Sequence, residues 1–347
     1  MARTLMGVAP LETYYRTATG PRTTPLTDPK GAHLPRDIDF GLVHVFSRDE
    51  HSVVFQPRCR FWHRFEADNP DANWREDPEA FYCFKTSFAY NLIGEEHPRI
   101  VPVLGQDAWT GLPILQKPSY GSLRNLFGEY QSKLYTVRAG AASPDDRIKP
   151  EFLPLAYQWS LQLLSALVLI HSRDIAYGEI IPDSCWLSAE SLDISLAGFI
   201  GSEFRDPATG WFFPGYFFTS IEFSPSLLPP SRMVQEPTLA TDMFMFGRLI
   251  YCVMTSYMPG EGMGHGPQET ERLMRDEEWM PDLEDEFMGR VIHKCWRYDY
   301  DTIEDLQSEV QALIESYGWS INGDEVEELD IDHIKTLLQG SLTNREQ

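Results

Sequence analysis

Residues 167–198, LVLIHSRDIAYGEIIPDSCWLSAESLDISLAG, contain the strongest fold signal in this chain. They begin inside a long apolar run with helical spacing, and they end in two short apolar runs, CWLS and LDISLA, on either side of the turn AES. This order predicts a long helix over residues 153–173, then a loop, and then a β-hairpin. The loop region holds two acids that are candidates for a catalytic base, Asp174 and Glu179.

The spacing of apolar residues changes near residue 121. Before it, short apolar runs predict strands, over residues 43–47, 52–56, 80–84, 99–104 and 112–116. After it, longer runs with helical spacing predict helices, over residues 121–134, 153–173, 240–255, 285–296 and 303–318. A strand-rich part followed by a helix-rich part predicts an α+β protein with two lobes, a small N-lobe over about 39–117 and a larger C-lobe over about 118–313.

Two segments lie outside these lobes. Residues 1–38 are a predicted flexible arm, because they include a stretch rich in Thr, Pro and Gly over residues 16–37. Residues 314–347 are a predicted acidic, helical tail with regularly spaced apolar residues, Val326, Leu329, Ile334, Leu337 and Leu338. This spacing predicts that the tail docks on the body of the protein or on a partner. Within the C-lobe, residues 131–150 are predicted to form a loop insertion.

The chain is strongly acidic, with a formal net charge of -23 and a pI near 4.7. Nucleic acids and anionic membranes are bound through an excess of Lys and Arg, so this charge argues against both as partners. A basic protein partner fits the charge. So does a solvated surface that only keeps the protein in solution.

The cysteines and the hydropathy pattern bear on location. The chain has five cysteines and no CxxC pair, which favours reduced thiols in a cytoplasmic or nuclear protein. Its first residues lack the apolar run of a signal peptide, and no segment approaches 18 uninterrupted apolar residues. We therefore expect a protein that is neither secreted nor transmembrane.

The run from residue 153 to residue 199 resembles the middle of the eukaryotic protein-kinase fold, where a long helix leads into the catalytic loop, a hairpin and the metal-binding turn. Other pieces follow in the family's order, HPRIVPVLG at 97–105, LPILQKPSYGSLRNLF at 112–127 and TDMFMFGRLIYCVMT at 241–255. The resemblance covers residues 80 to about 313. It implies the two-lobed kinase fold.

The resemblance also separates the two acids of the loop. In the family, an asparagine lies five residues after the catalytic aspartate, with a proline between them. Counting from Glu179 gives Pro182 and then Ser184, whereas counting from Asp174 gives Glu179 itself. The resemblance therefore places Glu179 at the position of the catalytic base, in a degenerate form, and makes Asp174 the end of the preceding helix.

The positions that hold metal in the family have changed. Protein kinases bind two Mg²⁺ ions through the asparagine of the catalytic loop and the aspartate of the DFG motif. Ser184 stands at the first position and Gly198, in the sequence Gly-Phe-Ile, at the second. A neutral hydroxyl and a hydrogen atom are poor ligands for a hard cation, so we expect no metal site here. Ile181 also replaces the lysine of the catalytic loop.

The nucleotide positions are altered as well. The resemblance puts Lys85, in FYCFK, at the place of the phosphate-anchoring lysine, but no acid precedes Glu95 in the segment after it, and no GxGxxG motif lies upstream. At the hinge that would contact adenine, Gln116 and Pro118 are the candidate binding residues, and proline has no backbone N–H to donate. Asp242 matches a structural aspartate of the family that ties a helix N-terminus to the backbone of the catalytic loop.

The segment between Gly198 and Ser226 is unusually rich in aromatic residues, Phe199, Phe204, Trp211, Phe212, Phe213, Tyr216, Phe217, Phe218 and Phe223. It either folds back to form a core of its own or presents a binding surface.

Three functional hypotheses follow. The leading one is a catalytically inactive, kinase-like protein that binds other proteins as a scaffold or regulator and takes no cofactor. The second is a divergent protein kinase with Glu179 as base, Lys85 on the phosphates and metal held by Asp193 or Ser184. The third is a small-molecule-binding or phosphotransfer relative on the same scaffold. Binding of ATP without Mg²⁺ is compatible with the first.

Overall fold

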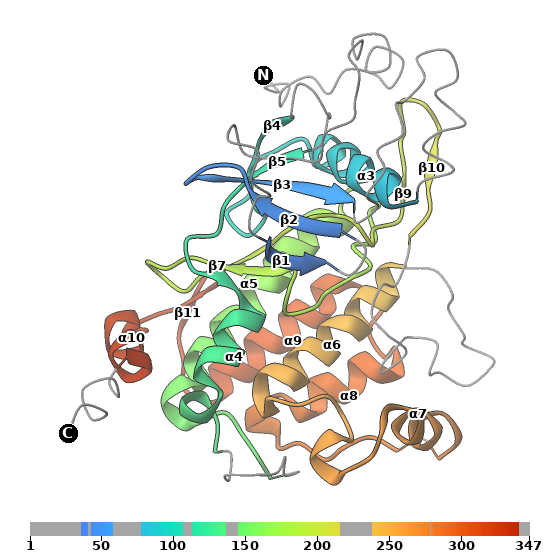
Figure 1. The fold of residues 1–347 in the computed structure, drawn as a ribbon. Helices are drawn as coiled ribbons and strands as arrows, with labels where there is room; N and C mark the ends of the chain where they lie inside the picture. The colour runs from blue at the N-terminus through green and yellow to red at the C-terminus, as the bar shows by residue number, and fades with distance from the viewer. Residues whose placement is uncertain are drawn as a thin grey trace.

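The computed structural model describes most of the chain, in residues 36–40, 43–57, 78–106, 113–136, 145–215, 238–277 and 279–339. These parts form an α+β structure, as expected, in which an antiparallel sheet with one helix lies beside a larger helical part (Figure 1).

The largest sheet has five strands in the order β1-β2-β3-β5-β4, all antiparallel to their neighbours. They are β1 (Arg36–Phe40), β2 (Val43–Ser47), β3 (Ser52–Pro57), β4 (Val103–Gln106) and β5 (Pro113–Gln116). The predicted strands at 43–47, 52–56 and 112–116 are confirmed, whereas the strand predicted from 99 begins only at Val103. β1 begins inside the predicted arm, so the boundary at residue 38 was placed too late. Residues 1–35 lie outside the described parts.

The strand predicted at 80–84 is wrong. These residues belong to helix α3 (Pro78–Ile93), which packs on β3 and β5. The helix begins with proline at its first position, where the fixed φ angle suits a helix, and it is followed by Gly94 with φ 70°, whose N–H bonds to the carbonyl of Tyr90 at 3.1 Å. Lys85 therefore stands in the middle of a helix and not on a strand.

The helical part is built around the predicted long helix, α5 (Leu153–His171). The other helices of this part are α4 (Leu123–Leu134), α6 (Leu239–Thr255), α7 (Pro267–Asp276), α8 (Gly289–Arg297) and α9 (Ile303–Ser316), of which α6 and α9 pack on α5. Residues Pro150–His171 would by length and composition also suit a membrane span, but 83% of their most apolar 18 residues are buried inside the fold. Buried core helices pass the same test of length and composition, and α5 is the core helix of this fold.

The predicted hairpin after α5 is confirmed as β7 (Cys185–Leu187) and β8 (Ile194–Leu196), which pair antiparallel. β6 (Gly121–Ser122) adds a third strand, and its Ser122 is also the N-cap of α4. A second hairpin, β9 (Phe204–Arg205) and β10 (Phe212–Phe213), lies further along the chain, next to α3 in Figure 1.

The C-terminal tail docks on the body of the protein, which was one of the two predicted alternatives, the other being a partner. α9 runs to Ser316, so the predicted boundary before residue 314 cuts a helix. The chain then forms the small hairpin β11 (Ile321–Asn322) and β12 (Glu325–Val326) and the helix α10 (Ile331–Gln339), which contacts α4. Val326 is buried, but it belongs to the strand β12 and not to a helix as predicted. Of the predicted insertion, residues 131–134 belong to α4, and residues 137–144 lie outside the described parts.

Candidate functional site

The loop between α5 and β7 is held by one buried carboxylate from the first turn of α6. The Oδ2 atom of Asp242 accepts a hydrogen bond from the backbone N–H of Tyr177 at 2.6 Å, and Oδ1 accepts one from Gly178 at 2.7 Å. The side chain of His171, at the end of α5, lies 2.9 Å from Oδ2. The predicted role of Asp242, in tying a helix N-terminus to the loop backbone, is confirmed by these contacts. Gly178 has φ 84°, a conformation that favours glycine.

Asp174 and Glu179 have opposite surroundings. Asp174 is an exposed turn residue whose N–H bonds to the carbonyl of His171 at 2.9 Å, so it ends the helix as predicted. Glu179 is only 6% exposed. Burial raises the pKa of Glu179 to about 8, against the opposing charges of Arg248 and Lys85. At neutral pH this carboxyl group is therefore mostly protonated, and a protonated carboxyl cannot act as a general base.

Lys85 is fully buried, and its ammonium group is bonded to the chain itself. Nζ donates to the backbone carbonyl of Ser202 at 2.5 Å and to that of Pro214 at 3.0 Å. These two residues flank the β9–β10 hairpin, so Lys85 joins both ends of the hairpin to α3. Burial lowers the pKa of Lys85 to about 7, and the nearby carboxylates of Glu203 and Glu179 act in the opposite direction.

Glu95 does not act as a partner for this lysine. Its carboxylate accepts from the guanidinium of Arg173 at 2.6 Å, in an exposed pair on the surface. The segment after Lys85 continues the same helix, since α3 begins seven residues before the lysine, at Pro78, and runs to Ile93.

Ser184 and Gly198, at the altered metal positions, are both committed to local structure. The Ser184 hydroxyl accepts from the N–H of Ile181 at 3.1 Å, and it lies 3.0 Å and 2.9 Å from the carbonyl oxygens of Glu179 and Ile181, one of which takes its single proton. Gly198 follows β8 with φ 73°, which a side chain would disfavour. The Ser184 hydroxyl therefore stabilises the loop between α5 and β7, and Gly198 allows the turn after β8.

Phe199 closes the region between α3 and the loop. It is fully buried, with its ring centroid 4.9 Å from that of Tyr90 on α3 and 5.3 Å from that of Tyr177 in the loop, both in edge-on geometry. Edge-on aromatic pairs add to the free energy gained from burial. Together with Lys85, this ring joins α3 firmly to the segment after β8.

At the hinge position, the backbone donors are used within the protein. The N–H of Gln116 bonds to the carbonyl of Pro102 at 2.9 Å, and the N–H of Lys117 bonds to that of His51 at 2.8 Å. Pro118 has no N–H. The three consecutive positions from Gln116 to Pro118 thus offer adenine no backbone donor that is not already engaged.

Side chains of the described residues do not gather to bind a metal ion. In the described ranges, no group of three or more His, Cys, Asp or Glu side chains is placed to hold a metal ion. Asp193, an alternative ligand in the divergent-kinase hypothesis, accepts hydrogen bonds from Gln158 and Gln162 and pairs with Arg99 at 3.1 Å. Its carboxylate is occupied in a separate cluster.

In its described part, the aromatic segment has both packed and exposed rings. Phe204 and Phe213 stack with ring centroids 4.7 Å apart, and Phe213 lies 5.0 Å from Phe88 of α3. By contrast, Trp211 and Phe212 are 39% and 46% exposed. The part of this segment beyond residue 215 lies outside the described residues.

The burial of two arginines was not predicted from the sequence. Arg99 and Arg248 are each 5% exposed, and Arg248 lowers the pKa of Glu179 by its charge. A buried arginine has no local signal, because its burial depends on acids far away in the sequence. The helical placement of Lys85 did have a signal, since Pro78 and Gly94 are start and stop residues for a helix.

No protein-family model matches this chain, and no curated protein sequence matches it either.

Proposed function

We propose that this chain is a protein-kinase-like protein that transfers no phosphate and acts by binding other proteins. The order of elements supports the kinase-like reading. A five-stranded sheet with α3 inserted between β3 and β4 is followed by α4, the long helix α5, the loop held by Asp242, the β7–β8 hairpin and α6.

The observation that carries the proposal is the position of Lys85. In protein kinases, a lysine on the third strand contacts the phosphates and pairs with a glutamate on the helix that follows. Here the third strand reads SVVFQP, with Gln56 after three apolar residues, and the following helix carries Lys85 in its middle. The charge has moved from the strand to the helix, where it holds two backbone carbonyls.

The remaining chemistry supports the same conclusion. Phosphoryl transfer depends mainly on metal ions and cations that neutralise the phosphates. In this site, Lys85 is bonded to Ser202 and Pro214, the Ser184 hydroxyl to its own loop, and Glu179 is buried beside both. These groups stabilise one conformation, and a stable conformation is what a binding protein presents to a partner.

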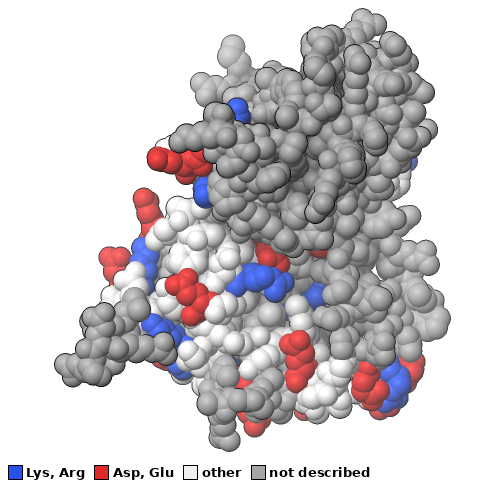
Figure 2. All heavy atoms as spheres, viewed as in Figure 1, with Lys and Arg blue, Asp and Glu red and all other residues white. Residues whose placement is uncertain are grey.

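The net charge alone does not mark the docking surface. On the face shown in Figure 2, acidic and basic side chains of the described residues are interspersed over the helical part, without a continuous patch of one sign. A partner would therefore be chosen by shape and local contacts as well as by charge.

The test is a phosphoryl-transfer assay on the full chain with labelled ATP, Mg²⁺ or Mn²⁺, and both acidic and basic protein substrates. We expect incorporation no greater than that of the Glu179→Gln variant. Transfer by the natural chain that disappears in Glu179→Gln would contradict the proposal. A partner recovered by cross-linking in equal yield with both proteins would support it, because binding would then be independent of the catalytic position.

A further inference from the structure

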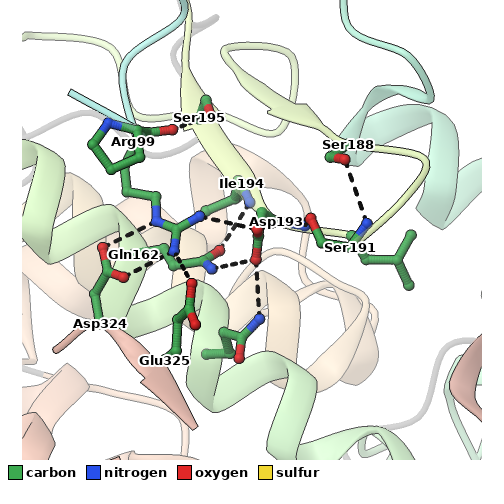
Figure 3. Close-up of polar contacts among 12 residues, drawn as sticks. Arg99, Gln162, Ser188, Ser191, Asp193, Ile194, Ser195, Asp324 and Glu325 are labelled. Atoms are coloured by element: carbon green, nitrogen blue, oxygen red, sulfur yellow. Dashed lines mark hydrogen bonds and ion pairs between the residues drawn. The ribbon is translucent and has the colours of Figure 1, made fainter. Parts of the chain in front are cut away.

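Arg99 joins three segments that are far apart in the sequence (Figure 3). Its Nε and Nη2 atoms donate to the two carboxylate oxygens of Asp324 at 3.0 Å and 2.9 Å, and Nη2 also donates to Glu325 at 2.7 Å. Its Nη1 atom lies 3.1 Å from Asp193. Forked contacts of this kind fix the geometry of both partners as well as adding binding energy.

Asp193 is itself held by the core helix. The side-chain amides of Gln158 and Gln162, both on α5, donate to its Oδ1 at 3.1 Å and 2.6 Å, and Ser191 donates to Oδ2 at 2.7 Å. Figure 3 shows Gln162 and Asp193 on one side of Arg99 and the two tail carboxylates on the other. The cluster thus connects α5, the start of β8 and the tail through one buried cation.

The tail makes further contacts with the same region. We call residues 321–339 the C-terminal strap. The backbone N–H of Val326 donates to the side-chain oxygen of Gln158 at 3.2 Å, and three side chains of the strap are almost fully buried, Val326, Ile334 and Leu338. Lys133 on α4 donates to the carbonyl of Leu338, and Lys335 donates to that of Glu190. The strap therefore crosses α4, α5 and the turn of the β7–β8 hairpin.

Arg99 lies in a short segment that leads into β4, residues 97–101, which we call the joint. The N–H of Val101 bonds to the carbonyl of Leu196 on β8, and the N–H of Leu196 bonds to the carbonyl of Arg99, each at 2.9 Å. The hydroxyl of Ser195 donates to the carbonyl of Pro98 at 3.0 Å. The joint is thus the place where the large sheet is attached to the β7–β8 hairpin of the helical part.

We propose that the C-terminal strap is a conformational device that controls the joint. When the strap is docked, Asp324 and Glu325 complete the charge pairing of Arg99 and hold the joint against β8. When the strap is released, Arg99 keeps only Asp193, and the joint and β4 open more often. Such local opening is how parts of a folded protein become available for regulation without global unfolding. This inference does not depend on the proposed function.

Hydrogen–deuterium exchange on the full chain tests the device. The test variant is Asp324→Ala with Glu325→Ala, and the matched control is Glu327→Ala with Glu328→Ala. The control removes two negative charges from exposed neighbouring residues whose side chains contact no cation in the described part of the chain. We expect exchange in both the strap and the joint to rise by roughly tenfold or more in the test variant. The control should exchange like the natural chain.

Three results would contradict the proposal that the strap controls the joint. In the first, the strap exchanges faster and the joint does not, which would show that β8 alone holds the joint. In the second, both regions stay protected in the test variant, which would show that the carboxylates do not hold the strap. In the third, the control opens the joint as much as the test variant. Protection of α6 in every variant confirms that the chain is folded. A second variant, Ile334→Asp, places a charge in the buried apolar contact of α10 and should release the strap. It should then open the joint as the test variant does.

Discussion

Lys85 and Arg99 are both buried cations, but the protein stabilises them in different ways. Arg99 meets three carboxylates, two of them from the tail, in a cluster with the geometry of a forked ion pair. Lys85 donates to the backbone carbonyls of Ser202 and Pro214, and the charges of Glu203 and Glu179 act on its pKa. Arg99 thus contacts carboxylates, whereas Lys85 contacts backbone carbonyls at both ends of the β9–β10 hairpin.

The pKa values reflect this difference. Burial lowers the pKa of Lys85 to about 7, because the neighbouring charges compensate only in part for the loss of water. Burial also acts to lower the pKa of Arg99, but the hydrogen bonds and charges of its carboxylates outweigh it and raise the pKa. The carboxylates around Arg99 thus outweigh the effect of burial on its pKa, whereas at Lys85 burial outweighs the effect of the nearby charges.

The largest effect is expected at Arg99. Replacing it with methionine in Arg99→Met leaves Asp193, Asp324 and Glu325 near one another without their cation, and breaking a buried pair by removing one partner costs about 3 kcal/mol or more. Urea denaturation measures this loss in the free energy of unfolding. A loss below about 1 kcal/mol would show that the cluster behaves as an exposed surface pair.

The second effect is a dependence on pH at Glu179. The pKa of Glu179 in the folded protein, about 8, lies above its ordinary value of 4.5. The folded state therefore binds this proton more tightly than the unfolded state, so the contribution to stability is complete below pH 4.5 and is lost as the pH rises toward 8. A glutamine at the same place does not titrate.

We therefore expect the natural chain to lose about 3 kcal/mol of unfolding free energy relative to Glu179→Gln between pH 5 and pH 8, since one pKa unit corresponds to about 1.4 kcal/mol and this range covers most of the interval between the two pKa values. Denaturation curves of both proteins across this range give the difference. A difference that is constant or grows in the other direction would mean that Glu179 is ionised and paired in the folded state.

The smallest effect is expected at Lys85. In Lys85→Met an apolar chain of similar length replaces a buried ammonium, which removes the cost of burying the charge and loses polar contacts, among them the hydrogen bonds to Ser202 and Pro214. These changes nearly cancel, and we expect a change within about 1 kcal/mol. The measurement belongs at pH 6, where Glu179 holds its proton. A loss similar to that of Arg99→Met would remove the distinction between the two cations.

The sequence predicted the helical part better than the sheet. The apolar spacing of α5, α6 and α9 is long and regular, so these helices were found within a few residues. The run FYCFK is short and reads equally well as a strand, and only the flanking Pro78 and Gly94 distinguish it as helix. β1 has the polar–apolar alternation of a strand, but over only a few residues, RDIDF, and next to a stretch rich in Thr, Pro and Gly that predicts an arm.

For the candidate site, the sequence named individual residues, but, apart from the contact of Asp242, it did not predict which distant residues contact one another. The resemblance led us to expect that Asp242 binds the backbone of the loop, and it accepts hydrogen bonds from Tyr177 and Gly178. The contact between Lys85 and the ends of the β9–β10 hairpin joins residues more than 110 positions apart, and the Arg99 cluster joins residues more than 220 apart. Contacts of that range depend on the packed structure and leave no periodic signal in the sequence.

The central claim is that the polar groups of this site are bonded to the chain itself and do not hold ATP with its cations. The most direct measurement is calorimetric titration of the full chain with ATP, with and without Mg²⁺. We predict no Mg²⁺-dependent binding, and the same heats for the natural chain, Lys85→Met and Glu179→Gln. Binding that requires Mg²⁺ and is lost in both variants would contradict the account.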